Sequence, residues 1–264
     1  MFSFSKFFLA SSLEEAYSEL LKNKKNIILG GTSYLRMGNT SWNTAIDLSN
    51  LNLNYILEKE DFISIGAMTN FRSLETNSLL KDYFGEIFNT ALKDIIGVQF
   101  RTNVTVGATV FSKYGFSDLI PVLLALGSKV KLFNGGILTL ESFLNESDIR
   151  RDILVEILIP KKVYKTSFQC VRKSKTDYSI INLAICKSDN SVTIAVGSRP
   201  GKAILARKTM DIFNHSENIE NEIINAMKYI GNEIPLDSNM RGSKSYRELL
   251  LAALLRKGIQ EVLN

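Results

Sequence analysis

The stretch Ile28-Leu29-Gly30-Gly31-Thr32-Ser33-Tyr34-Leu35 decides how the rest of the chain is interpreted. An apolar run from Asn26 to Leu29 ends abruptly at two glycines, which predicts a buried strand that leads into a tight loop. Glycine adopts backbone angles closed to other residues and lets an anion approach the chain, while consecutive N–H groups and hydroxyls donate to phosphate oxygens. The loop is therefore a candidate phosphate cradle, and a plain tight turn is the alternative.

The loop differs from the two best-known nucleotide motifs. It lacks the Gly-Lys-Ser/Thr ending of a Walker loop and the Gly-x-Gly-x-x-Gly of a Rossmann turn, so both of those folds are disfavoured. A second candidate cradle, Thr105-Val106-Gly107-Ala108-Thr109, is also small and rich in hydroxyls after an extended stretch. Together the two segments could hold one diphosphate.

Asp118 follows the second candidate cradle and allows two interpretations. It precedes the apolar run Val122 to Leu126, where it would cap the N-terminus of a helix. A carboxylate near a nucleotide cradle can instead accept hydrogen bonds from ribose hydroxyls. The two roles exclude each other only partly.

The first part of the chain mixes strands and helices. Ser12 and Glu15 form a possible capping box ahead of an amphipathic helix, and Ala45 to Leu48 supplies a short strand that completes a βαβ-like unit. The remaining predicted elements of this part are a hairpin of 55–57 and 62–65, helices near 71–76 and 79–96, a hairpin of 130–133 and 137–140, and a strand over 154–159.

The last hundred residues have a different pattern. Residues 180–187 and 191–196 pair across 188–190, and helices are expected near 203–213, 219–230 and 246–258. We therefore predict an α+β protein with a first domain over residues 1–162, divided into subdomains of about 1–54 and 55–162, and a C-terminal domain over 163–264.

Composition narrows the class of protein. The chain has 264 residues, of which 45% are apolar, but no run approaches the roughly 20 apolar residues that cross a bilayer. The start lacks the pattern of a secretory signal, so we expect a soluble, cytoplasmic protein with no membrane partner. Two cysteines and one histidine cannot hold a zinc ion or an iron–sulfur cluster. The net charge of +5 comes from scattered lysines and arginines, which does not favour nucleic-acid binding.

These pieces occur in the same order and spacing as in the FAD-binding medium subunits of molybdenum hydroxylases, the xanthine dehydrogenase and carbon monoxide dehydrogenase type. The chain resembles that family over essentially its whole length. Residues 29–33 resemble the family's Ala-Gly-Gly-Thr/His-Ser, and residues 97–107 its Gly-x-Gln-Ile-Arg-x-x-x-Thr-Ile-Gly, while Asp118 falls on the aspartate of its Asp-Leu-x-Pro. Further similar segments are 45–48, 65–69, 168–177, 197–200 and 237–247.

The resemblance implies a two-part FAD-binding domain of the PCMH/vanillyl-alcohol-oxidase type, followed by a small C-terminal domain of antiparallel strands and helices. It implies that both candidate cradles wrap the FAD diphosphate, that Asp118 contacts the adenosine half and that Leu154 packs near the adenine. Phe168 and Gln169 fall where the family brings its second domain over the flavin, although an ordinary core role is an equal alternative for Phe168. The cofactor-binding residues so implied are Leu29, Gly30, Gly31, Thr32, Ser33, Tyr34, Leu35, Thr105, Val106, Gly107, Ala108, Thr109, Asp118, Leu154, Phe168 and Gln169.

The chain departs from the family pattern at several positions. Ala108 replaces the second glycine, Thr109 the asparagine, and residues 112–115 read Ser-Lys-Tyr-Gly where the family has Asn-Ala-Ser/Asp-Pro. Ile95 stands where some members have an aromatic residue, and Gln169 where some have lysine. Because Ala108 is small and Thr109 can donate, FAD is expected to be retained.

A flavin subunit needs no catalytic side chain or metal ligand of its own, which agrees with the scarcity of histidine and cysteine. The resemblance implies an oxidoreductase subunit that is not active on substrate alone. It would pass electrons from an iron–sulfur small subunit, fed by a large subunit that carries the molybdenum cofactor, to NAD or another acceptor. The alternatives are a standalone FAD reductase of the UDP-N-acetylenolpyruvoylglucosamine reductase type and a non-catalytic flavin-binding or assembly module.

Overall fold

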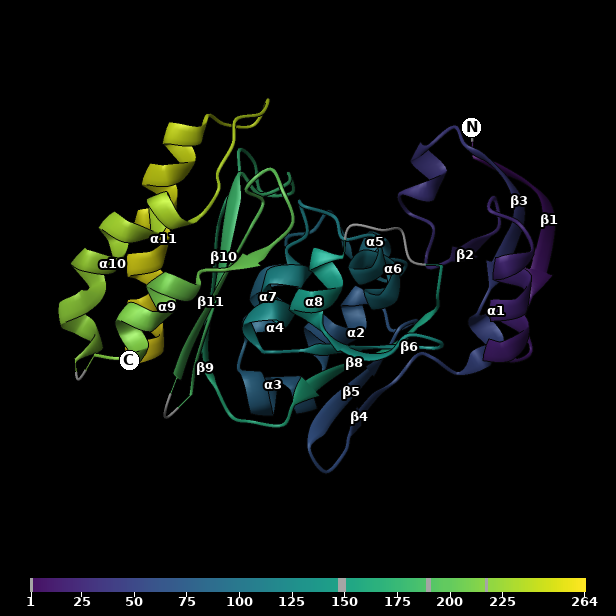
Figure 1. Ribbon diagram of the computed structural model, residues 1–264, viewed down its shortest axis with the longest axis horizontal. Coiled ribbons are helices and arrows are strands. Elements are labelled where there is room, and N and C mark those ends of the chain that lie inside the picture. The colour runs from purple at the N-terminus through teal and green to yellow at the C-terminus, as the bar shows by residue number, and fades with distance from the viewer. Residues whose placement is uncertain (1, 147–150, 189–190, 217) are drawn as a thin grey trace. The chain divides into compact units, whose positions relative to one another are not determined.

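The computed structural model describes residues 2–146, 151–188, 191–216 and 218–264, and most of its helices and strands are labelled in Figure 1. Contacts group the chain into two compact units. Unit 1 comprises residues 1–73, 97–112 and 128–159, and unit 2 comprises 74–96, 113–127 and 160–264. These units are groups of contacting residues, and the division into domains 1–162 and 163–264 stays a prediction beside them.

Unit 1 begins with a small parallel sheet in the order β1-β3-β2, formed by Ser3–Leu9, Ser41–Asp47 and Ile27–Leu29. The predicted helix is α1, Leu13–Lys22, and Ser12 caps it by accepting a hydrogen bond from the backbone of Glu15. The Glu15 carboxylate accepts from the backbone and hydroxyl of Ser11, so only half of the capping box forms. Strand β1 is an edge strand that the sequence analysis missed, and β2 is half-buried where a buried strand was expected.

The second sheet of unit 1 has five strands in the order β4-β5-β8-β6-β7. The predicted hairpins are β4 (Ile56–Glu58) with β5 (Phe62–Gly66) and β6 (Lys129–Leu132) with β7 (Gly136–Thr139), both antiparallel, and the predicted buried strand is β8, Leu154–Pro160. Leu140 was expected in the hairpin but starts helix α8, Leu140–Asn145. The short helices of this unit are η1 (Leu35–Met37), η2 (Ser49–Leu51), α5 (Val98–Arg101) and α6 (Val106–Phe111), and α2 covers Phe71–Thr76.

Unit 2 is built on a four-stranded antiparallel sheet in the order β12-β11-β10-β9. The predicted pair is β10 (Ile181–Ser188) and β11 (Ser191–Gly197), with β9 (Lys165–Val171) and β12 (Ile204–Leu205) outside it. The connecting positions 189 and 190 lie outside the described residues. The helices of this unit are α3 (Ser78–Phe84), α4 (Ile87–Leu92), α7 (Leu119–Ala125), α9 (Arg207–Asn214), α10 (Ile219–Glu233) and α11 (Lys244–Leu263).

One helix was expected over residues 79–96, but the chain forms α3 and α4 there. Gly85 separates them with a φ of +61°, an angle that ends a helix and that glycine adopts at little cost.

Helices α10 and α11 lie along the sheet of unit 2 (Figure 1), and their apolar faces and the strands share one hydrophobic cluster that includes Leu183, Ile185 and Leu255. Within the described ranges, no helix is both long and apolar enough to cross a membrane.

Arg247 on α11 is fully buried and joins this helix by hydrogen bonds to the residue before β10 and to the loop before α11. Its guanidinium donates to the carbonyl oxygens of Ile180 (2.9 Å), Asp237 (2.7 Å) and Gly242 (2.5 Å) and to Asn239 Oδ1 (2.7 Å). Burial disfavours the charged form and lowers the pKa of Arg247. The planar fork of donors satisfies four separate acceptors at once, which no other side chain can do.

Replacing this fork is expected to destabilise unit 2. Arg247→Met removes four hydrogen bonds donated by a buried guanidinium, and because each contributes about 1 kcal/mol net, the free energy of unfolding should fall by about 3 kcal/mol or more. Lys257→Met, at a two-thirds exposed position of the same helix, is the matched control and should change stability by less than about 0.5 kcal/mol. Urea unfolding of both variants measures the difference, and equal midpoints would contradict the assigned role of Arg247.

Candidate functional site

The loop after β2 has an unusual backbone that the sequence analysis expected only in part. Gly31 has a φ of +71°, and Thr32, which is not a glycine, has a φ of +58°. A Cβ atom on Gly31 would lie 1.7 Å from the carbonyl oxygen of Asn103, closer than two atoms can approach. Only glycine fits this position, because both the angle and the space exclude a side chain. Tyr34 then caps the 3-10 turn η1, in which Met37 N donates to Tyr34 O (3.1 Å), and Arg36 N donates back to Thr32 O (3.0 Å).

The two candidate cradles lie against each other in unit 1. A Cβ on Gly30 would meet Ala108 Cβ at 2.7 Å and Thr105 Oγ1 at 3.0 Å. Ala108, which departs from the family's glycine, is therefore accommodated because Gly30 has no side chain. The contact with Asn103 could not be predicted from the sequence, because Asn103 stands at a position that the motif of residues 97–107 leaves unspecified.

The two segments differ in the hydrogen-bond donors that they have left. In the second segment, Val106 N donates to Thr69 O (2.9 Å), Gly107 N to Ala67 O (2.8 Å), and the Thr109 hydroxyl to Thr105 O (2.9 Å). The Thr109 donor that was expected to be available is thus engaged within its own helix. In the first segment, no described residue accepts a hydrogen bond from the backbone N–H groups of Gly31, Thr32 and Ser33. The first loop supplies the donors, and the second supplies a small packing surface beneath it.

Ser33 has a buried hydroxyl whose surroundings fit a ligand oxygen. Its hydroxyl oxygen is buried and has no hydrogen-bond partner among the described residues. A buried hydroxyl without a partner costs free energy, so native proteins almost always pair it. Amide donors without acceptors, two positive φ angles and this hydroxyl together fit the phosphate oxygens of a diphosphate such as that of FAD.

Removing the Ser33 hydroxyl is expected to lower the affinity for FAD without lowering the stability of the apoprotein. Ser33→Ala should weaken FAD binding by about 10- to 100-fold, the value of one hydrogen bond to a charged group. The apoprotein should be as stable as the wild type or slightly more so, because an unpaired buried hydroxyl has been removed. Calorimetric titration with FAD and thermal melting of the apoprotein measure the two quantities.

A matched control exists on strand β5. Ser64 is fully buried, and its hydroxyl likewise has no partner within the described part of the chain, but it lies outside the loop. Ser64→Ala should change the stability of the apoprotein in the same way and leave FAD affinity unchanged. Unaltered FAD affinity in Ser33→Ala would remove Ser33 from the site.

Asp118 belongs to unit 2 and is the centre of a buried polar network. Its Oδ1 accepts hydrogen bonds from the Ser179 hydroxyl (2.7 Å) and Asn182 Nδ2 (2.6 Å), and its Oδ2 accepts one from Arg172 Nη2 (2.9 Å). The Asp118 and Arg172 side chains are 5% and 8% exposed. Burial disfavours the charged guanidinium and lowers its pKa, but Asp118 and Cys170 together outweigh burial, so the pKa of Arg172 is raised.

The helix-cap interpretation of Asp118 is wrong. Asp118 stands at the N-cap position of α7 but its side chain makes no cap hydrogen bond, and the Ser117 hydroxyl accepts from Ile120 N (3.2 Å) instead. The carboxylate points to partners far along the chain, which sequence spacing could not indicate. Since Oδ2 accepts one bond from the protein, it has a second acceptor position left, and contact with adenosine stays a prediction.

The other predicted residues have buried positions on strands. Leu154 lies on β8 of unit 1 opposite Leu132, and Phe168 lies on β9 of unit 2 opposite Ala184. The Gln169 amide donates to the Ser167 hydroxyl (2.9 Å) and to Glu261 Oε2 on α11 (2.6 Å). Flavin contacts by these three residues stay predictions.

Comparison with known proteins adds to this geometry. Residues 2–162 match the family model described as the FAD binding domain in molybdopterin dehydrogenase, and residues 166–262 match the CO dehydrogenase flavoprotein C-terminal domain. Together the two models cover nearly the whole chain.

Curated proteins and a solved structure are similar over the same length. The glyceraldehyde dehydrogenase medium chain of Sulfolobus acidocaldarius is 25% identical over 277 residues, with 96% of each chain covered. The nicotine 6-hydroxylase medium subunit of Paenarthrobacter nicotinovorans is 25% identical over 270 residues, with 95% of this chain and 94% of the relative covered. A chain of the Cu,Mo-CO dehydrogenase in its cyanide-inactivated form superposes with a TM-score of 0.89 at 18% identity, covering 98% of this chain and 97% of that one. The expected α+β fold is thereby confirmed.

Proposed function

Because the chain belongs to the family of FAD-binding medium subunits of molybdenum hydroxylases, we propose that it relays electrons from an iron–sulfur partner subunit through FAD to NAD or another acceptor. When bound, FAD supplies a ring that accepts and releases electrons one or two at a time. The protein supplies the binding site and the surroundings of that ring. Its two cysteines and one histidine cannot ligate an iron–sulfur cluster, so such a cluster belongs to another chain.

The loop from Leu29 to Leu35 carries the proposal. Its free N–H groups and the buried Ser33 hydroxyl are donors, and donors of this kind hold phosphate oxygens. We assign the diphosphate of FAD to this loop, with the Thr105–Thr109 segment packed against Gly30 to fix the loop in place. Leu154 near the adenine, Asp118 at the adenosine half, and Phe168 and Gln169 over the flavin complete the proposed set of binding residues.

The names of two relatives support the proposal that this chain has partner subunits. Both are described as a medium chain or medium subunit, which implies smaller and larger companions in those enzymes. We propose the same for this chain, with a small iron–sulfur subunit and a large subunit that carries the molybdenum cofactor and hydroxylates the substrate. The match of residues 166–262 to a CO dehydrogenase flavoprotein domain favours this assignment over a standalone FAD reductase.

Affinity purification of the tagged full chain from its native cells tests the proposal. We expect a cysteine-rich small protein and a large protein to co-purify, with iron, molybdenum and FAD present, and we expect NADH to bleach the flavin absorbance. A chain that purifies alone with FAD and oxidises NADPH with an enolpyruvyl nucleotide sugar would establish the reductase alternative. Bound FAD that neither NADH nor the reduced complex can reduce would establish the non-catalytic module.

A further inference from the structure

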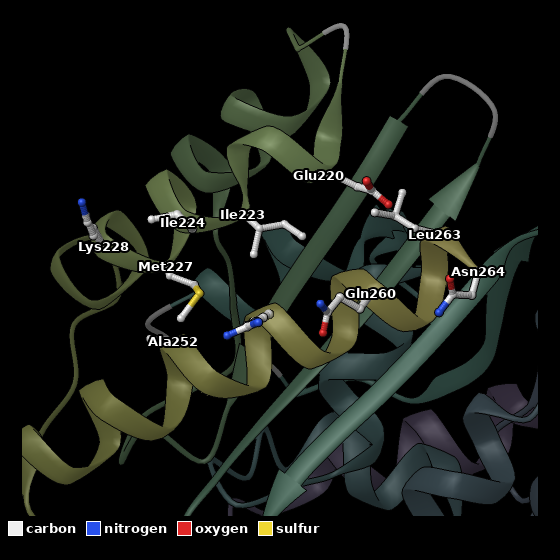
Figure 2. Close-up of a pocket in the computed structure, with 10 residues that line it drawn as sticks. Glu220, Ile223, Ile224, Met227, Lys228, Ala252, Gln260, Leu263 and Asn264 are labelled. Carbon is white, nitrogen blue, oxygen red and sulfur yellow. The ribbon is translucent and has the colours of Figure 1, made fainter.

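A groove runs along the outer surface of unit 2, between helices α10 and α11 (Figure 2). It has a volume of about 780 Å³, and each helix contributes a row of side chains at the spacing of one helix face. The row on α10 consists of Glu220, Ile223, Ile224, Met227 and Lys228. The row on α11 includes Ala252, Arg256, Gln260 and Asn264.

The wall formed by α10 is apolar in its middle. Ile223 is 8% exposed and belongs to the hydrophobic cluster of unit 2, and Met227 packs against that cluster. Ile224 beside them is 66% exposed. Exposed aliphatic side chains next to a methionine are typical of a surface that another protein covers, because methionine is flexible and adapts to a partner's side chains. The proposed FAD site uses none of these residues.

The wall formed by α11 carries a positive charge in its middle. Arg256 lies one turn from Ala252 on one side and one turn from Gln260 on the other. The next residue, Lys257, pairs with Glu261 four positions farther along the helix. Arg256 has alanine and glutamine at the equivalent positions, and among the described residues no carboxylate forms an ion pair with it. Its charge is therefore available to a group from outside the chain.

The ends of the groove add one charge of each sign. Lys228 lies toward the end with Ala252, and Glu220 lies toward the end with Asn264, about 12 Å away along α10 (Figure 2). A two-fold axis across the middle of the groove would bring Arg256 of one copy beside Arg256 of a second copy, so like charges disfavour a second copy as the occupant. The positive middle is instead complementary to a partner that carries carboxylates.

We propose that the groove binds an acidic amphipathic helix of a partner subunit, which packs along α10 and α11 as a third helix. This inference rests on the proposed function, which supplies the partner subunits. Two adjacent helices leave a groove of the kind that a third helix fills in a helix bundle. From Ala252 to Asn264 the α11 wall is about 18 Å long, the length of about twelve helical residues. The apolar face of the bound helix covers Ile224 and Met227, and one of its carboxylates pairs with Arg256.

Co-purification with the tagged full chain from its native cells tests the apolar part of the proposal. Ile224→Glu should lower the amount of partner subunit recovered at least about tenfold, because a charge would be buried against the apolar face of the bound helix. Leu249→Glu is the matched control, since Leu249 on α11 is 73% exposed but does not line the groove, and it should leave the recovery unchanged. Both positions are exposed, so melting temperatures should stay close to that of the wild type.

A charge reversal tests the contact with Arg256. Arg256→Glu should lower the recovery of the partner subunit by a similar factor through repulsion from the bound carboxylate. Lys257→Glu makes the same change one residue away, outside the groove, and should have little effect. A photo-crosslinking amino acid in place of Ile224 should react with one helical segment of a partner subunit. Replacing a carboxylate of that segment with lysine should restore the recovery by Arg256→Glu.

The outcomes separate this inference from the proposed function. Equal recovery of partner subunits by the wild type, Ile224→Glu and Arg256→Glu would overturn the inference and leave the proposed function standing. Crosslinks to a second copy of this chain, or to a segment without carboxylates, would overturn it as well. A wild-type chain that recovers no partner subunit would overturn the proposed function and this inference together.

Discussion

The variant Gly31→Ala should purify as a folded protein with little or no FAD. A methyl group at this position would lie 1.7 Å from the Asn103 carbonyl oxygen, so the loop must move and carry the N–H groups of Gly31, Thr32 and Ser33 away from the diphosphate. Loss of two or more charge-assisted hydrogen bonds costs about 3 kcal/mol or more, which is at least roughly a 100-fold fall in affinity. The flavin absorbance of the purified chain and a calorimetric titration of the apoprotein measure the effect.

Gly136→Ala is the control for this experiment. Gly136 also lies in unit 1 and has a φ of +68°, close to the +71° of Gly31, but a Cβ there would meet nothing within 4 Å. The substitution therefore reproduces the cost of the left-handed backbone, about 1 kcal/mol, without the collision. It should destabilise the protein slightly and leave FAD content unchanged. Normal FAD content in Gly31→Ala would show that the loop does not hold the diphosphate.

The second large effect is expected at Asp118. Asp118→Ala removes the only carboxylate that contacts Arg172 in the described structure and leaves a guanidinium that is 8% exposed without its counter-charge. Breaking a buried ion pair from one side costs about 3 to 5 kcal/mol, so the free energy of unfolding of the apoprotein should fall by that amount. This expectation differs from that of a residue that serves only to bind FAD, which would leave the apoprotein unchanged.

Asp94→Ala is the comparison for Asp118→Ala. Asp94 is also in unit 2 and pairs with Lys175, but at 3.7 Å and with side chains that are 31% and 80% exposed. An exposed pair of this kind contributes about 0 to 1 kcal/mol. Guanidinium unfolding of the two apoproteins measures both changes, and similar small losses in both would show that the Asp118 network is not a major source of stability.

Much of the fold follows from local sequence patterns. The hairpin β4–β5 is framed by apolar runs around a polar turn, and α11 contains the continuous apolar run from Leu249 to Leu255, so each is indicated by nearby residues. Strand β1 could not be predicted in the same way, because its aromatic residues Phe4 and Phe7 are exposed at the edge of a sheet and show no regular alternation. Its place is decided by pairing with β3, more than thirty residues away.

The candidate site likewise has features that the local sequence predicts and features that only the structure shows. The two glycines and the hydroxyls after β2 are visible in the sequence because the motif is local. The burial of Ser33, the contact of Gly30 with Ala108 and the partners of Asp118 depend on residues that are distant in the chain. The cofactor was inferred from the resemblance to the family. The structure shows that the backbone N–H groups without a protein acceptor are in the first loop, and that the Thr109 hydroxyl donates to the carbonyl oxygen of Thr105.

The central claim is that the loop from Leu29 to Leu35 holds the diphosphate of FAD, and titration of the full apoprotein with FAD and with riboflavin tests it most directly. Riboflavin has the same ring but no phosphate, so the quenching of flavin fluorescence should show FAD binding at least about 100-fold tighter. The preference should largely disappear in Gly31→Ala and persist in Gly136→Ala. Equal affinity for FAD and riboflavin, or an undiminished preference in Gly31→Ala, would contradict the claim.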